Sequence, residues 1–168
     1  MTESSNDLPI DTLGPYLAER IDDFGTLQSA EKFADGQSNP TFRLVTDRHQ
    51  FVLRRKPAGP VLPSAHAVDR EYRVMSALAE TAVPVPKMRL LCEDESVIGT
   101  IFFVMDFVEG EIHFDAQLKT VTDPARRGAI YDQMNQVLAD LHSVDLAAVG
   151  LTDYGRPGNY FERQLNRW

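Results

Sequence analysis

Two short strands joined by a tight turn are predicted by residues 41–54, which read TFRLVTDRHQFVLR. The polar stretch 46–49 separates two runs of strand-forming residues, which is the pattern of a β-hairpin. On the second strand Val52 and Arg54 are two positions apart and therefore share one face of the sheet. A cation placed in this way can hold a diphosphate or triphosphate, and a charged strand end is the plainer alternative.

The composition is that of one average folded domain and excludes several classes of protein. The chain has 168 residues, of which 43% are hydrophobic, and its single cysteine is Cys92. A disulfide within the chain and a cysteine-based zinc site are therefore excluded. No apolar run approaches the roughly 18 residues that a membrane span requires. The polar and acidic start, residues 1–7, does not have the pattern of a secretory signal, so we expect a cytoplasmic location.

The charge is acidic overall but unevenly distributed. The formal net charge is −8, which argues against nucleic acid as a partner. Residues 51–90 differ, because they hold seven Lys or Arg and three Asp or Glu. Such a basic island can serve a small anion, whereas a solvated basic face is the alternative.

The alternation of apolar and polar residues, the positions of turn-forming residues and the helical spacing of apolar residues together predict an α+β fold. We expect five strands, at 28–33, 41–45, 50–54, 87–92 and 100–108. Three helices are expected: one capped by Asp11, one running from a cap at Ser64 to about Glu80, and one starting at Asp123-Pro124. Because the connections between neighbouring strands are mostly hairpins, the sheet is expected to be five-stranded and mostly antiparallel, with a helix packed on it.

Three further segments contain residue types suited to a nucleotide. The turn Gly36-Gln37-Ser38-Asn39 can direct several backbone N–H groups at a phosphate, or it is an ordinary hairpin turn. Glu71 on the second helix can orient the Arg54 cation, or it is a surface carboxylate. The apolar strand that ends in Met105-Asp106-Phe107-Val108 can present backbone groups to an adenine edge, or it is simply buried.

The order and spacing of these segments resemble the aminoglycoside phosphotransferase family, whose fold is that of the protein kinases. The segments that carry the resemblance are GQSNPTF at 36–42, VLRRKP at 52–57, VPVP at 83–86, FVMDFVEG at 103–110 and LADLHSVD at 138–145. They are particularly similar to a bacterial branch of small-molecule kinases that also occurs fused to acyl-CoA dehydrogenase domains. The resemblance implies a protein-kinase-like N-lobe at 1–108 and the incomplete beginning of a helical C-lobe at 109–168.

The resemblance also implies ATP as the phosphate donor and gives each matching residue a role. Arg54 would take the place of the phosphate-binding lysine, with Glu71 as its helix partner. Arg55 would be the fallback, although it lies on the opposite face of the strand. The remaining residues would surround the nucleotide: Gly36, Gln37, Ser38, Asn39 and Thr41 over the phosphates, Val52 and Met105 around the adenine, and Asp106 and Val108 with backbone groups on its edge. An arginine in place of lysine keeps the charge but changes the geometry.

One part of the family pattern has no counterpart in the chain. The catalytic His-Gly-Asp segment is absent, since none of the four histidines precedes Gly-Asp, and so are the metal-binding Asn and Asp that follow it. We therefore expect no catalytic and no metal-binding residue here, with Mg²⁺ bound in a complete protein. The parent activity would be ATP-dependent transfer of a phosphoryl group to a hydroxyl of an unidentified small molecule, and the chain alone is expected to be inactive.

The alternative function is a non-catalytic module that binds a nucleotide or a partner. The helix from Arg126 to His142 would have an exposed apolar face, because Ile130, Met134 and Leu141 lack later helices to pack against. A second copy of the chain or a separate C-lobe chain is expected to cover this helix. The plainest interpretation is a small α+β domain without a nucleotide site.

Overall fold

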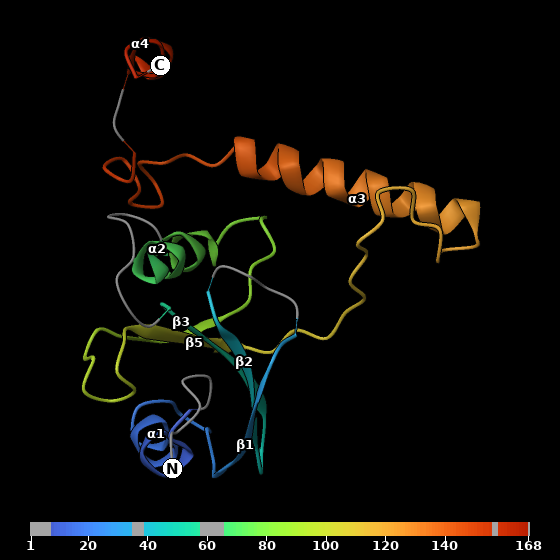
Figure 1. The fold of residues 1–168 in the computed structure, drawn as a ribbon. Helices are drawn as coiled ribbons and strands as arrows, with labels where there is room; N and C mark the ends of the chain where they lie inside the picture. The colour runs from blue at the N-terminus through green and yellow to red at the C-terminus, as the bar shows by residue number, and fades with distance from the viewer. Residues whose placement is uncertain (1–7, 35–38, 58–65, 156–157, 168) are drawn as a thin grey trace.

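The computed structural model describes residues 8–34, 39–57, 66–155 and 158–167 (Figure 1). Its centre is a sheet of five strands in the order β1-β2-β3-β5-β4, in which every neighbouring pair is antiparallel. The strands are β1 Leu27–Lys32, β2 Thr41–Thr46, β3 Gln50–Arg55, β4 Met88–Cys92 and β5 Phe102–Asp106. The α+β fold and the five-stranded antiparallel sheet expected from the sequence are therefore confirmed.

Two helices cover the sheet, one on each face (Figure 1). They are α1, Ile10–Ala18, and α2, Val68–Leu78. The expected cap at Asp11 is wrong, because α1 already begins at Ile10 and no side chain caps it. The carbonyl of Pro9 instead accepts the N–H of Leu13 at 2.9 Å. Ser64, the expected cap of the second helix, lies outside the described residues.

The main hydrophobic core lies between α1 and the sheet. Leu13 and Leu17 of α1 are fully buried against Leu44, Leu53 and Val104 of the strands. Each buried leucine contributes roughly 1.5–3 kcal/mol to folding. Because strand side chains alternate between faces, the burial of Leu53 on the α1 side fixes the register of β3 and turns its neighbours in sequence to the α2 side.

The pairing of β3 places a row of residues on the α2 face of the sheet. Arg54 pairs with Thr41 of β2 and with Phe103 of β5. One step along the same face, Val52 pairs with Met105. The cation and the predicted adenine residues are thus neighbours on one surface.

Beyond β5 the chain leaves the sheet and becomes helical. The strand ends at Asp106, two residues earlier than predicted, and Phe107 donates its N–H to the Gln50 carbonyl at 3.3 Å. The later helices are α3, Pro124–His142, and α4, Tyr160–Leu165. The expected cap at Asp123 is confirmed, since its carboxylate accepts the N–H of Ala125 at 2.9 Å. No helix within the described ranges is long and apolar enough to cross a membrane.

A segment that follows α3 is fastened to the exposed side of α2. Arg70 donates from Nη2 to the Tyr154 carbonyl at 2.8 Å, and its guanidinium carbon lies 4.2 Å from the centre of the Tyr154 ring. Arg73 donates to the Gly150 carbonyl at 3.1 Å and forms an ion pair with Asp153. We call these five residues the α2 clasp. Helix α2 is thereby held from its exposed side as well as by the sheet.

Replacing Arg73 by Gln should raise the pKa of the Asp153 carboxyl group toward its ordinary value. The Arg73 guanidinium donates a hydrogen bond to this carboxylate and holds its pKa below that value. Because the pKa is lowered by folding, the pair stabilises the fold above the ordinary carboxyl pKa, and this contribution is lost as the pH falls through the lowered one. NMR titration of the side-chain carboxyl carbons measures the change, with Arg20→Gln as the control. An unchanged Asp153 pKa in Arg73→Gln would contradict the clasp.

Candidate functional site

Arg54 and Glu71 meet on the α2 face of the sheet. Nε of Arg54 lies 3.1 Å from Oε2 of Glu71, and each side chain is 34% exposed. The distance is that of an ion pair, while the Nε–H is not aligned for a hydrogen bond to any described residue, so charge holds the two groups together. The predicted proximity of Arg54 and Glu71 is confirmed.

Packing of α2 on the sheet determines where Glu71 lies. Val68, at the first position of the helix, is fully buried. The ring of Tyr72 lies 6.1 Å from that of Phe103, the residue of β5 that pairs with Arg54. The residue next to Glu71 in sequence therefore contacts the strand neighbour of Arg54, and this brings the carboxylate to the cation.

The second oxygen of Glu71 is bound by a residue that precedes β2. Nδ2 of Asn39 donates to Oε1 of Glu71 at 2.8 Å, and Oδ1 of Asn39 lies 2.9 Å from Nδ1 of His66. Asn39 is only 4% exposed. The hydroxyl of Thr41 donates to the Asn39 carbonyl at 3.0 Å. Asn39 and Thr41 thus lie beside the Arg54–Glu71 pair, whereas Gly36, Gln37 and Ser38 fall outside the described residues.

Arg55 points to the other face of β3 and is buried there. It is 6% exposed, and its guanidinium carbon lies 5.4 Å from the centre of the Phe42 ring. Burial lowers the pKa of the Arg55 guanidinium. Since Arg55 is part of the interior on the α1 side, Arg54 is the arginine of this pair that faces Glu71.

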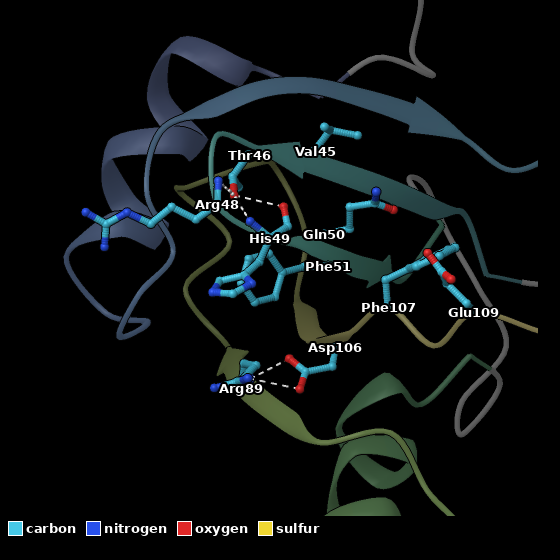
Figure 2. A pocket seen from close by; sticks show the side chains of 10 residues that line it. All are labelled: Val45, Thr46, Arg48, His49, Gln50, Phe51, Arg89, Asp106, Phe107 and Glu109. Carbon is cyan, nitrogen blue, oxygen red and sulfur yellow. Dashed lines mark hydrogen bonds and ion pairs between the residues drawn. The ribbon is translucent and has the colours of Figure 1, made fainter.

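Two groups characterise the link between the sheet and the later helices, residues 105–108: the side chain of Asp106 and the backbone N–H of Val108. Arg89 donates from Nε and Nη2 to the two carboxylate oxygens of Asp106 at 2.6 and 2.9 Å, which raises the pKa of Arg89 (Figure 2). Asp106 pairs with Phe51 of the core, so its side chain lies on the α1 side of the sheet, away from Arg54. The N–H of Val108 takes part in no main-chain hydrogen bond among the residues that the structure describes.

A hollow of about 470 Å³ opens beside the outer end of the link (Figure 2). Its walls come from the β2–β3 turn, including Arg48 and His49, and from Arg89, Phe107 and Glu109. Neither Arg54 nor Glu71 lines it. The hollow therefore borders the predicted adenine position from outside and does not contain the cation that would meet the phosphates.

Arg43 is a charged residue of this face that the sequence interpretation missed. It pairs with Val52, donates from Nε to Oε1 of Gln50 at 3.0 Å, and places its guanidinium carbon 5.0 Å from the centre of the Phe107 ring. The alternation of β2 alone puts Arg43 on the same face as Thr41, so the signal was present in the sequence. The contact with the link depends on the pairing of distant strands and could not be predicted from that pattern.

No group of three or more His, Cys, Asp or Glu side chains that could hold a metal ion occurs among the described residues. The donors near Arg54 are one carboxylate and amide or hydroxyl groups that already bind protein atoms. Mg²⁺ prefers several oxygen ligands in an octahedral arrangement. The described side chains do not fit such a site, and we derive no step through a metal.

The sequence matches the Phosphotransferase enzyme family over residues 29–168. A solved structure from Ralstonia eutropha, provisionally described as an aminoglycoside phosphotransferase, superposes with a TM-score of 0.82 at 50% identity and covers 96% of this chain. The chain therefore belongs to the Phosphotransferase enzyme family. Its fold is that of the kinase-like N-lobe and the beginning of the C-lobe, as the resemblance implied.

Similar curated proteins carry names from a different enzyme class. The chain is 47% identical to the Arabidopsis thaliana protein IBR3, named as an acyl-CoA dehydrogenase, over 99% of its own length and 21% of that protein. It is 46% identical to mouse acyl-CoA dehydrogenase family member 10, of which it covers 15%. The chain thus spans about a fifth or less of these relatives and 46% of the solved structure.

Substitution of the two neighbouring arginines, Arg54 and Arg55, should have different effects on the free energy of unfolding. Arg55→Ala should lower the free energy of unfolding by about 1–2 kcal/mol, because it removes a buried stem and a cation–π contact. Arg54→Ala should change it by less than about 1 kcal/mol, because the Arg54–Glu71 pair is one-third exposed to solvent. Chemical denaturation followed by circular dichroism measures both values. The opposite order would contradict the assignment of Arg55 to the interior and of Arg54 to the α2 face.

Proposed function

We propose that this chain is the nucleotide-binding half of an ATP-dependent phosphotransferase that acts on a hydroxyl group of a small molecule. The observation that carries the proposal is the Arg54–Glu71 ion pair at 3.1 Å, formed between the central strand and the helix packed on it. Membership of the phosphotransferase family gives the chemistry, and the pair gives the place where phosphates would bind.

In this proposal the guanidinium of Arg54 neutralises the phosphate charge. Its η nitrogens present two donors in one plane, which suits two phosphate oxygens better than a single ammonium would. Glu71 keeps the guanidinium in place from its Nε side. Asn39 and Thr41 lie at the edge where the phosphates would enter, and the residues before Asn39 would cover them.

The adenine would lie against the link and the strand residues beside it. Val52 and Met105 pair across β3 and β5 and offer an apolar surface next to Arg54. The backbone groups of Asp106 and Val108 would bind the adenine edge, as they do in the family that the sequence resembles. The Arg89–Asp106 contact would fix the link in position from the far side.

Transfer itself would require residues that this sequence does not contain. Phosphoryl transfer depends almost wholly on positioned charge around the phosphate and the acceptor hydroxyl. No histidine in the chain precedes Gly-Asp, the segment that would orient the acceptor in this family. The chain by itself would therefore bind ATP without transferring phosphate, and the acceptor would bind mainly to the rest of the C-lobe. A cytoplasmic location, where ATP is abundant, is part of this proposal.

The second element of the proposal is a partner that covers helix α3. Tyr131, Met134, Leu138 and Leu141 are between 43% and 59% exposed along this helix. An apolar surface of this extent favours association. Either a second copy of the chain or a separate C-lobe chain would cover the helix from Arg126 to His142. A non-catalytic module that binds a nucleotide or such a partner is the alternative function.

The chain should bind ATP, and Arg54→Ala should weaken this binding by roughly tenfold to a hundredfold, the range expected for hydrogen bonds to a charged group. Isothermal titration calorimetry measures both affinities, and Arg20→Ala, an exposed arginine on the opposite side of the sheet, is the matched control. A coupled assay on the same samples should show no turnover. Equal affinity in Arg54→Ala, or turnover by the purified chain, would contradict the proposed function.

A further inference from the structure

A series of polar contacts connects His66, which lies just before α2, to the guanidinium of Arg54. His66 contacts Asn39 at 2.9 Å, Asn39 contacts Glu71 at 2.8 Å, and Glu71 contacts Arg54 at 3.1 Å. The middle member, Asn39, is 4% exposed and is one of the few buried polar residues of the described chain. We call these four residues the Asn39 relay.

The direction of each hydrogen bond in the relay follows from the chemistry of its members. A carboxylate only accepts, so Asn39 must turn its Nδ2 donor toward Glu71 and its Oδ1 acceptor toward His66. Nδ1 of His66 must then carry a hydrogen and donate it to Asn39. The two hydrogen bonds thus run in one direction, from His66 to Asn39 and from Asn39 to Glu71.

The backbone around Asn39 is anchored to two strands. Thr41 of β2 donates its hydroxyl to the Asn39 carbonyl at 3.0 Å, and Arg55 of β3 donates its N–H to the Pro40 carbonyl at 3.0 Å. On the other side, Val68 donates its N–H to the His66 carbonyl at 2.9 Å at the start of α2. Asn39 therefore joins the sheet to the helix that carries Glu71.

We infer that Asn39 and His66 are positioning residues, which fix the Glu71 carboxylate so that Arg54 is held ready for the phosphates of a nucleotide. This inference rests on the proposed function. Asn39 would not bind the phosphates through its side chain, because its Nδ2 and Oδ1 atoms already contact Glu71 and His66. Without Asn39, the Glu71 carboxylate would lose the partner of Oε1 and, being one-third exposed, could rotate toward solvent.

The first test removes the middle of the relay. Asn39→Ala should weaken ATP binding roughly threefold to tenfold, as expected for one lost hydrogen bond to a charged group whose effect is passed on to Arg54. In a Glu71→Ala background, Asn39→Ala should cause no further loss of ATP affinity, because the carboxylate that Asn39 positions is then absent. Asn166→Ala, an exposed asparagine beyond α4, is the matched control and should leave the affinity unchanged.

The second test uses a variant whose effect a purely structural role would not produce. Asn39→Asp places a second carboxyl group beside Glu71, where Arg54 and His66 are the other charged or titratable groups in the relay. Like-charge repulsion between the two carboxylates favours uptake of one proton as the pH falls, and the shared proton restores a donor between the two oxygens. The ATP affinity of Asn39→Asp, divided by that of the wild type at each pH, should therefore rise as the pH falls from about 8 to about 5.

The third test needs no nucleotide. The ¹H–¹⁵N signal of the Arg54 Nε–H group should shift and exchange faster with water in Asn39→Ala, because the carboxylate that faces it is no longer held. An unchanged Arg54 signal, or additive losses in the double-variant cycle, would overturn the relay. Failure of the wild-type chain to bind ATP would instead overturn the proposed function, and the NMR signal would still decide whether Asn39 positions the Arg54–Glu71 pair.

Discussion

The arrangement of the sheet and helix α2 serves one electrostatic contact, the ion pair between Arg54 and Glu71. At one-third exposure such a pair adds little to stability, about 0–1 kcal/mol, so the fold does not depend on it energetically. The dependence is geometric. The pair exists because the central strand turns Arg54 to the α2 face and because α2 lies across that face, and packing on apolar residues contributes to both conditions.

The register of β3 is the first of these conditions. Leu53 is buried against α1, and its two neighbours in sequence must then point to the opposite face. A shift of one residue would bury Arg54 and place Leu53 and Arg55 toward α2. The core under α1 thus selects which arginine becomes the site cation, although α1 itself lies on the far side of the sheet (Figure 1). The second condition, the position of α2, is met by the Tyr72–Phe103 contact and by the clasp on its exposed side.

Local patterns in the sequence predict the hairpin, the order of strands and helices, and the face shared by Val52 and Arg54. They also predict Glu71 as the partner, because its distance along the chain matches a helix packed on the sheet. The contacts of Asn39 with His66 and Glu71 could not be predicted, since they join residues 27 and 32 positions apart through side-chain orientations that no periodicity encodes. The cap at Asp11 was mispredicted for a different reason: the helix starts at Ile10, two residues earlier than a cap at Asp11 would allow, and this places the carboxylate in the first turn.

The central claim is that nucleotide binds on the α2 face between Arg54 and the link. Hydrogen–deuterium exchange of the chain with and without ATP tests it most directly, because it reports on each segment separately. The account predicts slower exchange in three segments that are distant in sequence, at residues 50–56, 66–72 and 105–109. Protection confined to the acidic turn at 93–96, or no protection at saturating ATP, would contradict it.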